Sequence, residues 1–127
     1  IAPIRSQIFS YLVKGGQAPV KLFWGLPRKD SLYLYDEFRA LANEHPNFYL
    51  SISLDQETNF VGLDVEDFKR GRIDQTFSDF IKENKVSPTE LNNSEYYLCG
   101  AQEIVESLKG FLLDLGINKE NVFFDKF

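Results

Sequence analysis

The stretch Val20-Lys21-Leu22-Phe23-Trp24-Gly25 is short, apolar and rich in residues that favour β-strands. Pro27 ends this strand, and Asp30-Ser31 are typical of the start of a helix. The helix that follows has its apolar side chains on one face: Leu34, Phe38, Leu41 and Ala42. The sequence therefore predicts a strand followed by an amphipathic helix.

The same alternation of strand and helix continues on both sides of this unit. Apolar residues at helical spacing behind Pro3, stopped by Gly15-Gly16, predict a helix over residues 3–14. Further strands are expected over 47–54, 95–99 and 121–124, and further helices over 73–81 and 102–115. Residues 55–71 are polar and acidic and indicate a loop of about 15 residues, a length typical of functional or mobile loops. Residues 82–94 are expected to be a polar connection.

Connections of this length are too long for hairpins, so the strands are expected to be parallel. Right-handed crossovers then give an α/β fold, an open parallel sheet with helices on both faces. Ligands of such sheets bind at the carboxyl ends of the strands. The positions where a ligand is expected are therefore 25–27, 54–56 and 99–102.

Length and composition narrow the class of protein. The 127 residues, 43% of them hydrophobic, are enough for one domain with a substantial core. The net charge of −5 argues against binding to nucleic acid or to an anionic membrane surface. One cysteine and one histidine allow no internal disulfide and no zinc or iron-sulfur site, which favours a reducing, cytoplasmic setting. The sequence contains no apolar run of the roughly 20 residues that a membrane helix needs.

Four segments, found in the same order along the chain as in the family, resemble the nucleotide-binding domain of the ferredoxin-NAD(P)H reductase family. Residues 1–6, Ile-Ala-Pro-Ile-Arg-Ser, are similar to the segment after the family's glycine turn. The family's second strand and acidic-aromatic helix start are similar to Leu22-Phe23-Trp24-Gly25 and residues 32–38. Its Tyr-x-Cys-Gly motif is similar to Tyr97-Leu98-Cys99-Gly100, and its closing aromatic-acidic segment is similar to residues 123–127. The match implies a ferredoxin-reductase-like domain that lacks its first strand in this fragment. Two branches fit, the reductase components of ring-hydroxylating oxygenases and the F subunit of sodium-translocating NADH-quinone reductase, and the sequence leaves the choice open.

The resemblance implies that Cys99 and Gly100 lie beside the nicotinamide as catalytic residues, with Ala101 and Gln102 next to them. The family often has Pro-Pro and Met after this glycine, so Ala101-Gln102 is a departure from its pattern. Gly100 permits close backbone approach, and the helix that starts near Gln102 offers N–H groups and the positive end of its dipole. Without the resemblance, Cys99 would be interpreted as a small buried hydrophobic residue.

Other cofactor-binding positions follow from the same resemblance. Ala2 and Pro3 would follow the pyrophosphate turn, although Pro3 is also an ordinary start for a helix. Gly25, Leu26 and Pro27 would turn the chain beneath the adenosine, although an ordinary turn explains them as well. Phe127 would lie near the flavin ring.

Asp55 and Gln56 stand where NADP-dependent members of the family place Ser-Arg. A carboxylate accepts a hydrogen bond from a ribose 2′-hydroxyl and repels a 2′-phosphate, which favours NADH over NADPH. The alternative is that Asp55 is only a loop carboxylate. Arg28, Lys69, Arg70 and Arg72 are cations that could oppose this preference. The acidic stretch 64–67 lacks the spacing of a calcium loop and is expected to be a solvated loop, with no metal site.

The implied function is an NAD(P)H-binding domain that passes hydride to FAD. The implied partners are an FAD-binding β-barrel domain that precedes residue 1 in the same chain, and an iron-sulfur or quinone-linked electron acceptor. The expected location is the cytoplasm, or the cytoplasmic face of a membrane complex. A non-catalytic nucleotide-binding or protein-docking module is the alternative, because the fold by itself does not define an activity.

Overall fold

The computed structural model describes residues 2–126, and it separates into two compact units. One unit spans Leu12–Phe80, and the other contains the chain up to Tyr11 and from Ile81 onward. The helix α1 (Ala2–Val13) crosses from the second unit into the first. Each unit is described by itself.

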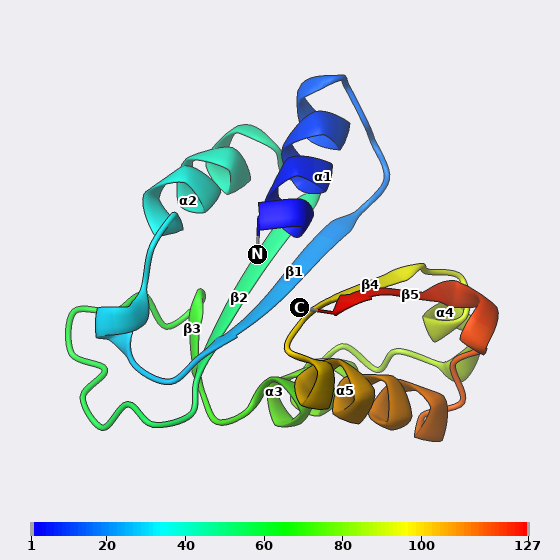
Figure 1. The fold of residues 1–127 in the computed structure, drawn as a ribbon. Helices are drawn as coiled ribbons and strands as arrows, with labels where there is room; N and C mark the ends of the chain where they lie inside the picture. Colours follow the sequence, from blue (N-terminus) through cyan, green and yellow to red (C-terminus); the bar gives the residue numbers. More distant parts are fainter. Residues whose placement is uncertain (1, 127) are drawn as a thin grey trace. The chain divides into compact units, whose positions relative to one another are not determined.

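The unit Leu12–Phe80 is built on a parallel sheet of three strands in the order β1 (Val20–Leu26), β2 (Phe48–Leu54) and β3 (Phe68–Arg70). Val20 pairs with Phe48 and Leu26 with Leu54, so β1 and β2 end at the same level. The central strand β2 is buried along nearly its whole length, as expected for a strand covered on both faces. Figure 1 shows the three strands side by side, running in one direction.

Helices cover both faces of this sheet because neighbouring residues of β1 point to opposite sides. Trp24 packs edge-on against Phe38 of α2 (Tyr35–Glu44), with ring centroids 5.8 Å apart. Phe23 packs edge-on against Phe77 and Phe80 of α3 (Ile73–Glu83), with centroids 5.1 and 5.5 Å away. Trp24 and Phe38 are buried in the core of the unit, whereas Phe23, Phe77 and Phe80 are half-buried.

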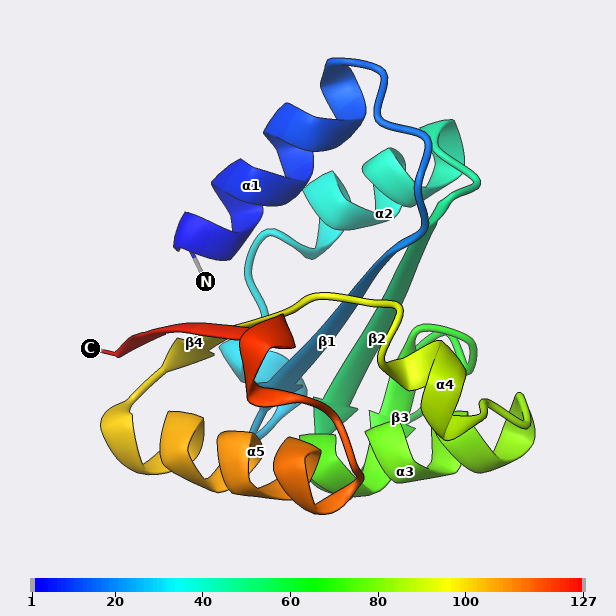
Figure 2. The same ribbon diagram turned by 90° about the vertical axis from the view of Figure 1, so that its right-hand side faces the viewer.

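The second unit contains the parallel pair β4 (Tyr96–Gly100) and β5 (Val122–Lys126), joined through α5 (Gln102–Asp114). The helix α5 packs against both strands, Val105 and Leu112 of α5 are buried, and the Lys109 ammonium lies 4.8 Å from the centre of the Phe124 ring. A short helix, α4 (Pro88–Leu91), precedes β4 and is capped by the Ser87 side chain. Figure 2 shows α5 running alongside β4 and β5.

The parallel strands and the helices on both faces of the first sheet confirm the predicted fold class. The strands form two hydrogen-bonded sheets rather than one, because no strand within residues 2–126 pairs with β1 on the side away from β2. The strand that the resemblance places before residue 1 lies outside the described residues.

Three local predictions were wrong. The helix expected from Asp30-Ser31 begins at Tyr35, because 29–31 form the 3-10 turn η1 (Lys29–Ser31) and Leu34 has a φ of 62°. The loop 55–71 contains β3, which pairs with β2, and the connection 82–94 contains α4. Another 3-10 turn, η2 (Lys119–Asn121), leads into β5.

Candidate functional site

The carboxyl ends of β1 and β2 bring together the residues predicted to lie on the adenosine side. The backbone N–H of Asp55 donates to the Leu26 carbonyl at 3.2 Å, and that of Gln56 donates to the Pro27 carbonyl at 2.8 Å. The pairing therefore continues one step beyond both strands, and 25–27 lie beside 55–56. Sequence reasoning placed these residues at one edge of the sheet, and the structure brings them into contact.

The surface at this edge is open to solvent. Gly25, Asp55 and Gln56 are all exposed, and no described residue donates a hydrogen bond to the Asp55 carboxylate. A Cβ added to Gly25 would lie 3.6 Å from Cβ of Ile73, an ordinary van der Waals contact. A side chain at this position would therefore not clash with the rest of the protein. Such an edge can accept a hydroxyl-bearing ligand.

Glu57, which sequence reasoning did not single out, ties the two strand-end loops together. One carboxylate oxygen accepts the backbone N–H of Lys29 at 2.9 Å, and the other accepts those of Thr58 and Asn59, each at 3.2 Å. The Lys29 ammonium in turn donates to the Asn59 carbonyl at 3.2 Å. The bond from the Lys29 backbone, followed by that from Asn59, lowers the pKa of Glu57 below its ordinary value. Nothing local in the sequence reveals this contact, because its main donor is a backbone group 28 residues away.

The cations that could have favoured a 2′-phosphate are mostly engaged elsewhere. Lys69 donates to the Val65 and Glu66 carbonyls, each at 2.9 Å. Arg70 lies over the Phe60 ring at 4.2 Å, and Arg72 pairs with Asp74 at 3.6 Å. Arg28 is exposed and directly follows Pro27. Arg28 is therefore the cation nearest in sequence to the contact between Pro27 and Gln56.

The end of β4 carries the residues predicted for the nicotinamide. Cys99 is half-buried and lies level with Asp125 of β5. Phe124 lies beneath Lys109 of α5 and is level with Leu98, so these two residues are on the face that α5 covers. Neighbouring residues of a strand point to opposite faces, and the Cys99 side chain therefore points away from α5. Tyr97 shares the face of Cys99 and stacks on Phe123, with centroids 5.1 Å apart.

Gly100 and Ala101 lead directly from β4 into α5. A Cβ at Gly100 would have Ile104 at 3.9 Å as its nearest neighbour. Ala101 is the N-cap of α5 and supplies no side-chain hydrogen bond, and α5 begins at Gln102. The first N–H groups of a helix have no intrahelical acceptor, and they carry the positive end of its dipole. The turn after Cys99 therefore leads into a helix end whose first N–H groups have no side-chain cap.

The two tyrosines of β4 have different surroundings. The Tyr96 hydroxyl donates to the Leu91 carbonyl at 2.7 Å, and burial raises its pKa. Tyr97 is exposed, and its hydrogen bond to Glu95, followed by desolvation, raises its pKa. Tyr96 therefore anchors the strand to α4, whereas Tyr97 is part of an exposed aromatic surface.

The remaining predicted residues are at the ends of the chain. Pro3 is exposed in the first turn of α1, and Ala2 is the first residue of that helix. Phe127 lies outside the described residues. The structure therefore brings 25–27 together with 55–56 in one unit and Cys99 together with 100–102 in the other.

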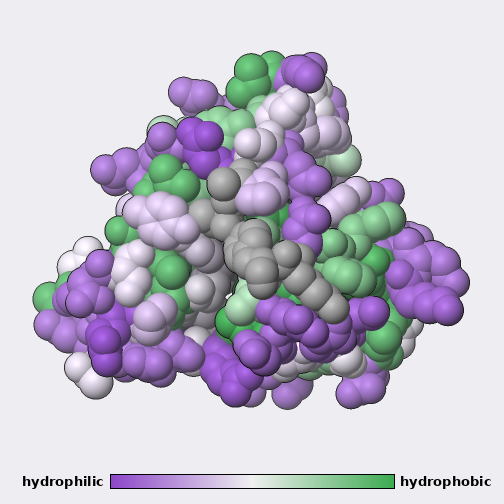
Figure 3. All heavy atoms as spheres, in the orientation of Figure 1, coloured by the Kyte–Doolittle hydropathy of each residue, from purple (hydrophilic) through white to green (hydrophobic). Residues whose placement is uncertain are grey.

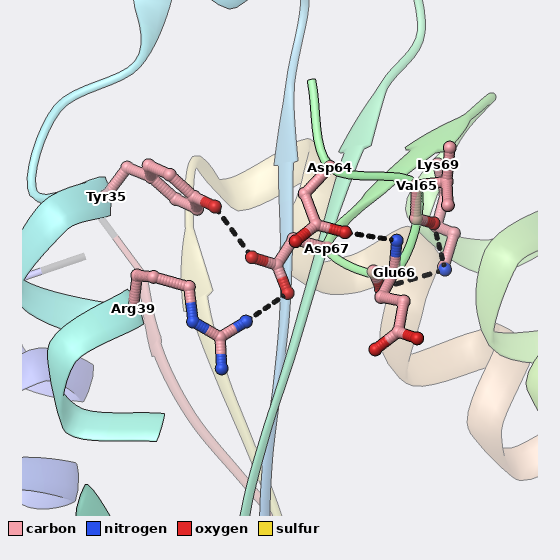
Figure 4. A network of polar contacts seen from close by, with 7 residues as sticks. All are labelled: Tyr35, Arg39, Asp64, Val65, Glu66, Asp67 and Lys69. Atoms are coloured by element: carbon pink, nitrogen blue, oxygen red, sulfur yellow. Dashed lines mark hydrogen bonds and ion pairs between the residues drawn. The ribbon is translucent and has the colours of Figure 1, made fainter. Parts of the chain in front are cut away.

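One expectation about the acidic loop was wrong. The Asp67 carboxylate is buried, and it accepts hydrogen bonds from the Tyr35 hydroxyl at 2.7 Å and from the Arg39 guanidinium at 2.6 Å (Figure 4). Burial, followed by the bond to Asp67, raises the pKa of Tyr35. Tyr35 and Arg39 are four residues apart on α2, a spacing that puts both side chains on one face, and this was the signal available in the sequence.

The rest of the acidic loop does lie at the surface. Asp64 accepts the Glu66 backbone N–H at 2.9 Å, and Val61 and Val65 are strongly exposed. Figure 3 shows mainly hydrophilic residues in this region, at the lower left. Within residues 2–126, no three His, Cys, Asp or Glu side chains are placed to hold a metal ion. In the same range, every helix is too short or too polar to span a bilayer.

One unit carries an exposed carboxylate and a glycine at its strand ends, and the other carries the first N–H groups of α5 after β4. Strand ends of α/β folds are where nucleotides bind. The sequence matches the family described as the oxidoreductase NAD-binding domain over residues 1–109. The chain belongs to this family, and the resemblance identified from its motifs is confirmed.

Similar proteins are oxidoreductases of greater length. The chain is 29% identical over 131 residues to the F subunit of the Na(+)-translocating NADH-quinone reductase of Haemophilus influenzae. It is 30% identical, also over 131 residues, to the same component of the Neisseria meningitidis enzyme. Both alignments cover 100% of this chain and 30% of the relative, so the chain spans less than a third of the length of these relatives.

Solved structures show the same fold. The cytochrome P450 reductase GcoB of Amycolatopsis superposes with a TM-score of 0.73 at 19% identity. The ferredoxin reductase in carbazole 1,9a-dioxygenase superposes with a TM-score of 0.65 at 22% identity. Each match covers 94% of this chain and 32% of the other. At these identities the similarity concerns the fold alone.

Proposed function

We propose that this domain binds NADH at its strand ends and positions the nicotinamide for hydride transfer to FAD in a larger flavoprotein. The observation that carries the proposal is the hydrogen-bonded contact between 26–27 and 55–56, which places an exposed carboxylate at the end of β2. Membership of the NAD-binding family supports it. Nicotinamide and flavin supply the redox chemistry, and the chain supplies binding, orientation and electrostatics.

The residues of β1 and β2 hold the adenosine side in this proposal. Asp55 accepts a hydrogen bond from a ribose hydroxyl, Gln56 offers an amide beside it, and Gly25 and Leu26 leave room for the adenosine. A 2′-phosphate would meet the Asp55 carboxylate, while Lys69, Arg70 and Arg72 have other contacts. NADH is therefore favoured over NADPH.

The residues of β4 and α5 act at the nicotinamide end. Cys99 contacts the nicotinamide ring, Gly100 allows its close approach, and the backbone at Ala101 and Gln102 meets its carboxamide. Pro3 and Ala2 begin a helix that faces the pyrophosphate, and Phe127 shields the flavin. No side-chain acid or base is needed for hydride transfer.

The flavin is expected on a β-barrel domain that precedes residue 1, which agrees with the length of the Haemophilus relative, of which this chain covers 30%. The name of the Haemophilus relative includes NADH and quinone, and that of a structural neighbour includes ferredoxin. We infer an iron-sulfur or quinone-linked acceptor and a location in the cytoplasm or on the cytoplasmic face of a membrane complex.

The full-length protein provides the test. It should purify with the visible absorbance of an oxidised flavin, and anaerobic NADH should bleach that absorbance. NADPH should bleach it more slowly at equal concentration. A colourless protein that binds NADH would indicate a non-catalytic nucleotide-binding module, and one that binds neither nucleotide would refute the proposal.

A further inference from the structure

Two carboxylates follow β2, and either could contact a ribose. Asp55 is exposed, and no described side chain or backbone N–H donates to its carboxylate. Glu57 uses both carboxylate oxygens within the protein, one for Lys29 and the other for Thr58 and Asn59. An ionised carboxylate can accept about four hydrogen bonds, so Glu57 has little capacity left for a ligand. The structure thus distinguishes the two acidic residues.

The contacts of Glu57 join the loop after β1 to the loop after β2. Backbone bonds from Asp55 to Leu26 and from Gln56 to Pro27 align the loops as far as residue 56. Glu57 extends this alignment by bonding to the Lys29 backbone, and the Lys29 side chain completes it through the Asn59 carbonyl. The backbone at Asp55 and Gln56 is therefore held on both sides, by the strand pairing before it and by Glu57 after it.

We propose that Glu57 is a positioning residue for the adenosine half of the nucleotide, and that Asp55 is the carboxylate that contacts the ribose. This inference rests on the proposed function. Glu57 fixes the direction of the loop from which Asp55 and Gln56 project, and it does not contact the nucleotide. Its loss therefore weakens every ligand with an adenosine diphosphate half to the same extent, whereas loss of Asp55 changes the choice between NADH and NADPH.

The test uses the full-length protein with its flavin and two half-nucleotide probes, ADP-ribose and nicotinamide mononucleotide. Glu57→Ala should weaken ADP-ribose binding about tenfold, since it removes hydrogen bonds to a charged acceptor. It should raise the KM for both NADH and NADPH by a similar factor with kcat unchanged, and leave binding of nicotinamide mononucleotide unaltered. Glu57→Gln keeps one acceptor oxygen for Lys29 and should weaken ADP-ribose by only about threefold.

Two comparison variants separate the roles. Asp55→Asn should change the ratio of NADPH to NADH efficiency, which Glu57→Gln leaves constant. Glu66→Gln is the matched control, because Glu66 is exposed in the same loop and its substitution removes the same charge. It should behave as wild type in each assay.

The inference is overturned if Glu57→Ala and Glu57→Gln bind ADP-ribose as tightly as wild type. It is also overturned if Glu57→Gln changes the NADPH to NADH ratio as much as Asp55→Asn, since Glu57 would then contact the ribose. If Glu57→Ala does not fold, Glu57→Gln decides. A wild-type protein that binds neither ADP-ribose nor NADH would instead refute the proposed function.

Discussion

Replacement of Asp67 by alanine should destabilise the unit Leu12–Phe80 by about 3 kcal/mol. The Asp67 side chain is only 4% exposed and accepts one bond from Arg39 at 2.6 Å and one from Tyr35 at 2.7 Å. Hydrogen bonds to charged groups contribute about 1.5–3 kcal/mol each, which gives a range of about 3–6 kcal/mol for the pair. The low end applies because the Arg39 side chain is 34% exposed and can turn to water.

Asp67→Asn should lower the free energy of unfolding by less, about 1–1.5 kcal/mol. Its amide oxygen can still accept from Arg39, and its NH2 group can donate to the Tyr35 hydroxyl, so only the charge is lost. The free energy of unfolding should therefore fall from wild type to Asp67→Asn and further to Asp67→Ala, as expected for a buried carboxylate that accepts from two donors.

Urea denaturation followed by tryptophan fluorescence measures this effect. Trp24 is the single tryptophan of the chain, is buried, and packs against Phe38 on the helix that carries Tyr35 and Arg39. With a slope of about 1.5 kcal/mol/M, a loss of 3 kcal/mol lowers the midpoint by about 2 M urea. Glu66→Gln, an exposed change of the same charge, should stay within about 0.5 kcal/mol of wild type. A midpoint for Asp67→Ala that equals that of this control would refute the reasoning.

Three further expectations concern cofactor choice, hydride transfer and alkaline stability. Asp55→Arg should raise NADPH efficiency relative to NADH by about tenfold, because it replaces repulsion of a 2′-phosphate with attraction; unchanged preference in steady-state kinetics would remove Asp55 from the site. Cys99→Ala should slow flavin reduction in stopped-flow experiments by about tenfold or more with ADP-ribose affinity unchanged, since a misplaced ring loses reaction geometry; an unaltered rate would make Cys99 only a packing residue. The pKa of Tyr35 is raised in the fold, so its contribution to stability is complete below the ordinary pKa of about 10 and is lost as pH rises through the folded value. Tyr35→Phe should therefore show a shallower fall of Tm between about pH 9 and 11, and a fall as steep as that of wild type would contradict this linkage.

The sequence predicted the elements whose signal is local. Val20–Leu26 and Phe48–Leu54 are β-rich apolar runs, and α3 and α5 carry regular apolar faces. The strand Phe68–Arg70 was missed because it has three residues and a single apolar one, so only its pairing with β2 defines it. The start of α2 was misplaced because Asp30-Ser31 have cap chemistry, while the backbone at Leu34 decides where the helix begins.

The contacts at the candidate site were predictable from the sequence only where they follow from the order of the strands. The adjacency of 25–27 and 55–56 follows from parallel strands that end at one edge, a rule that needs only the element order. The bond from Lys29 to Glu57 and both bonds to Asp67 come from partners 28 or more residues away, one of them a backbone N–H, and no spacing rule identifies such partners. Both carboxylates belong to a polar stretch that composition alone assigns to solvent.

The loop that follows β2 is fastened at both of its ends within one unit. Its first residues are bonded to the loop after β1 through Leu26, Pro27 and Lys29, and its last residue, Asp67, is bonded to α2. A segment held in this way loses little further conformational freedom when a ligand binds, so more of the interaction free energy contributes to affinity. The exposed carboxylate of Asp55 thus projects from a backbone that is held in place. In the proposed function, Asp55 favours a ribose hydroxyl over a 2′-phosphate because the loop cannot move away from the phosphate. If Asp55 contacts the ribose as proposed, the hydrogen bonds that fasten the loop therefore also support the choice of the nucleotide.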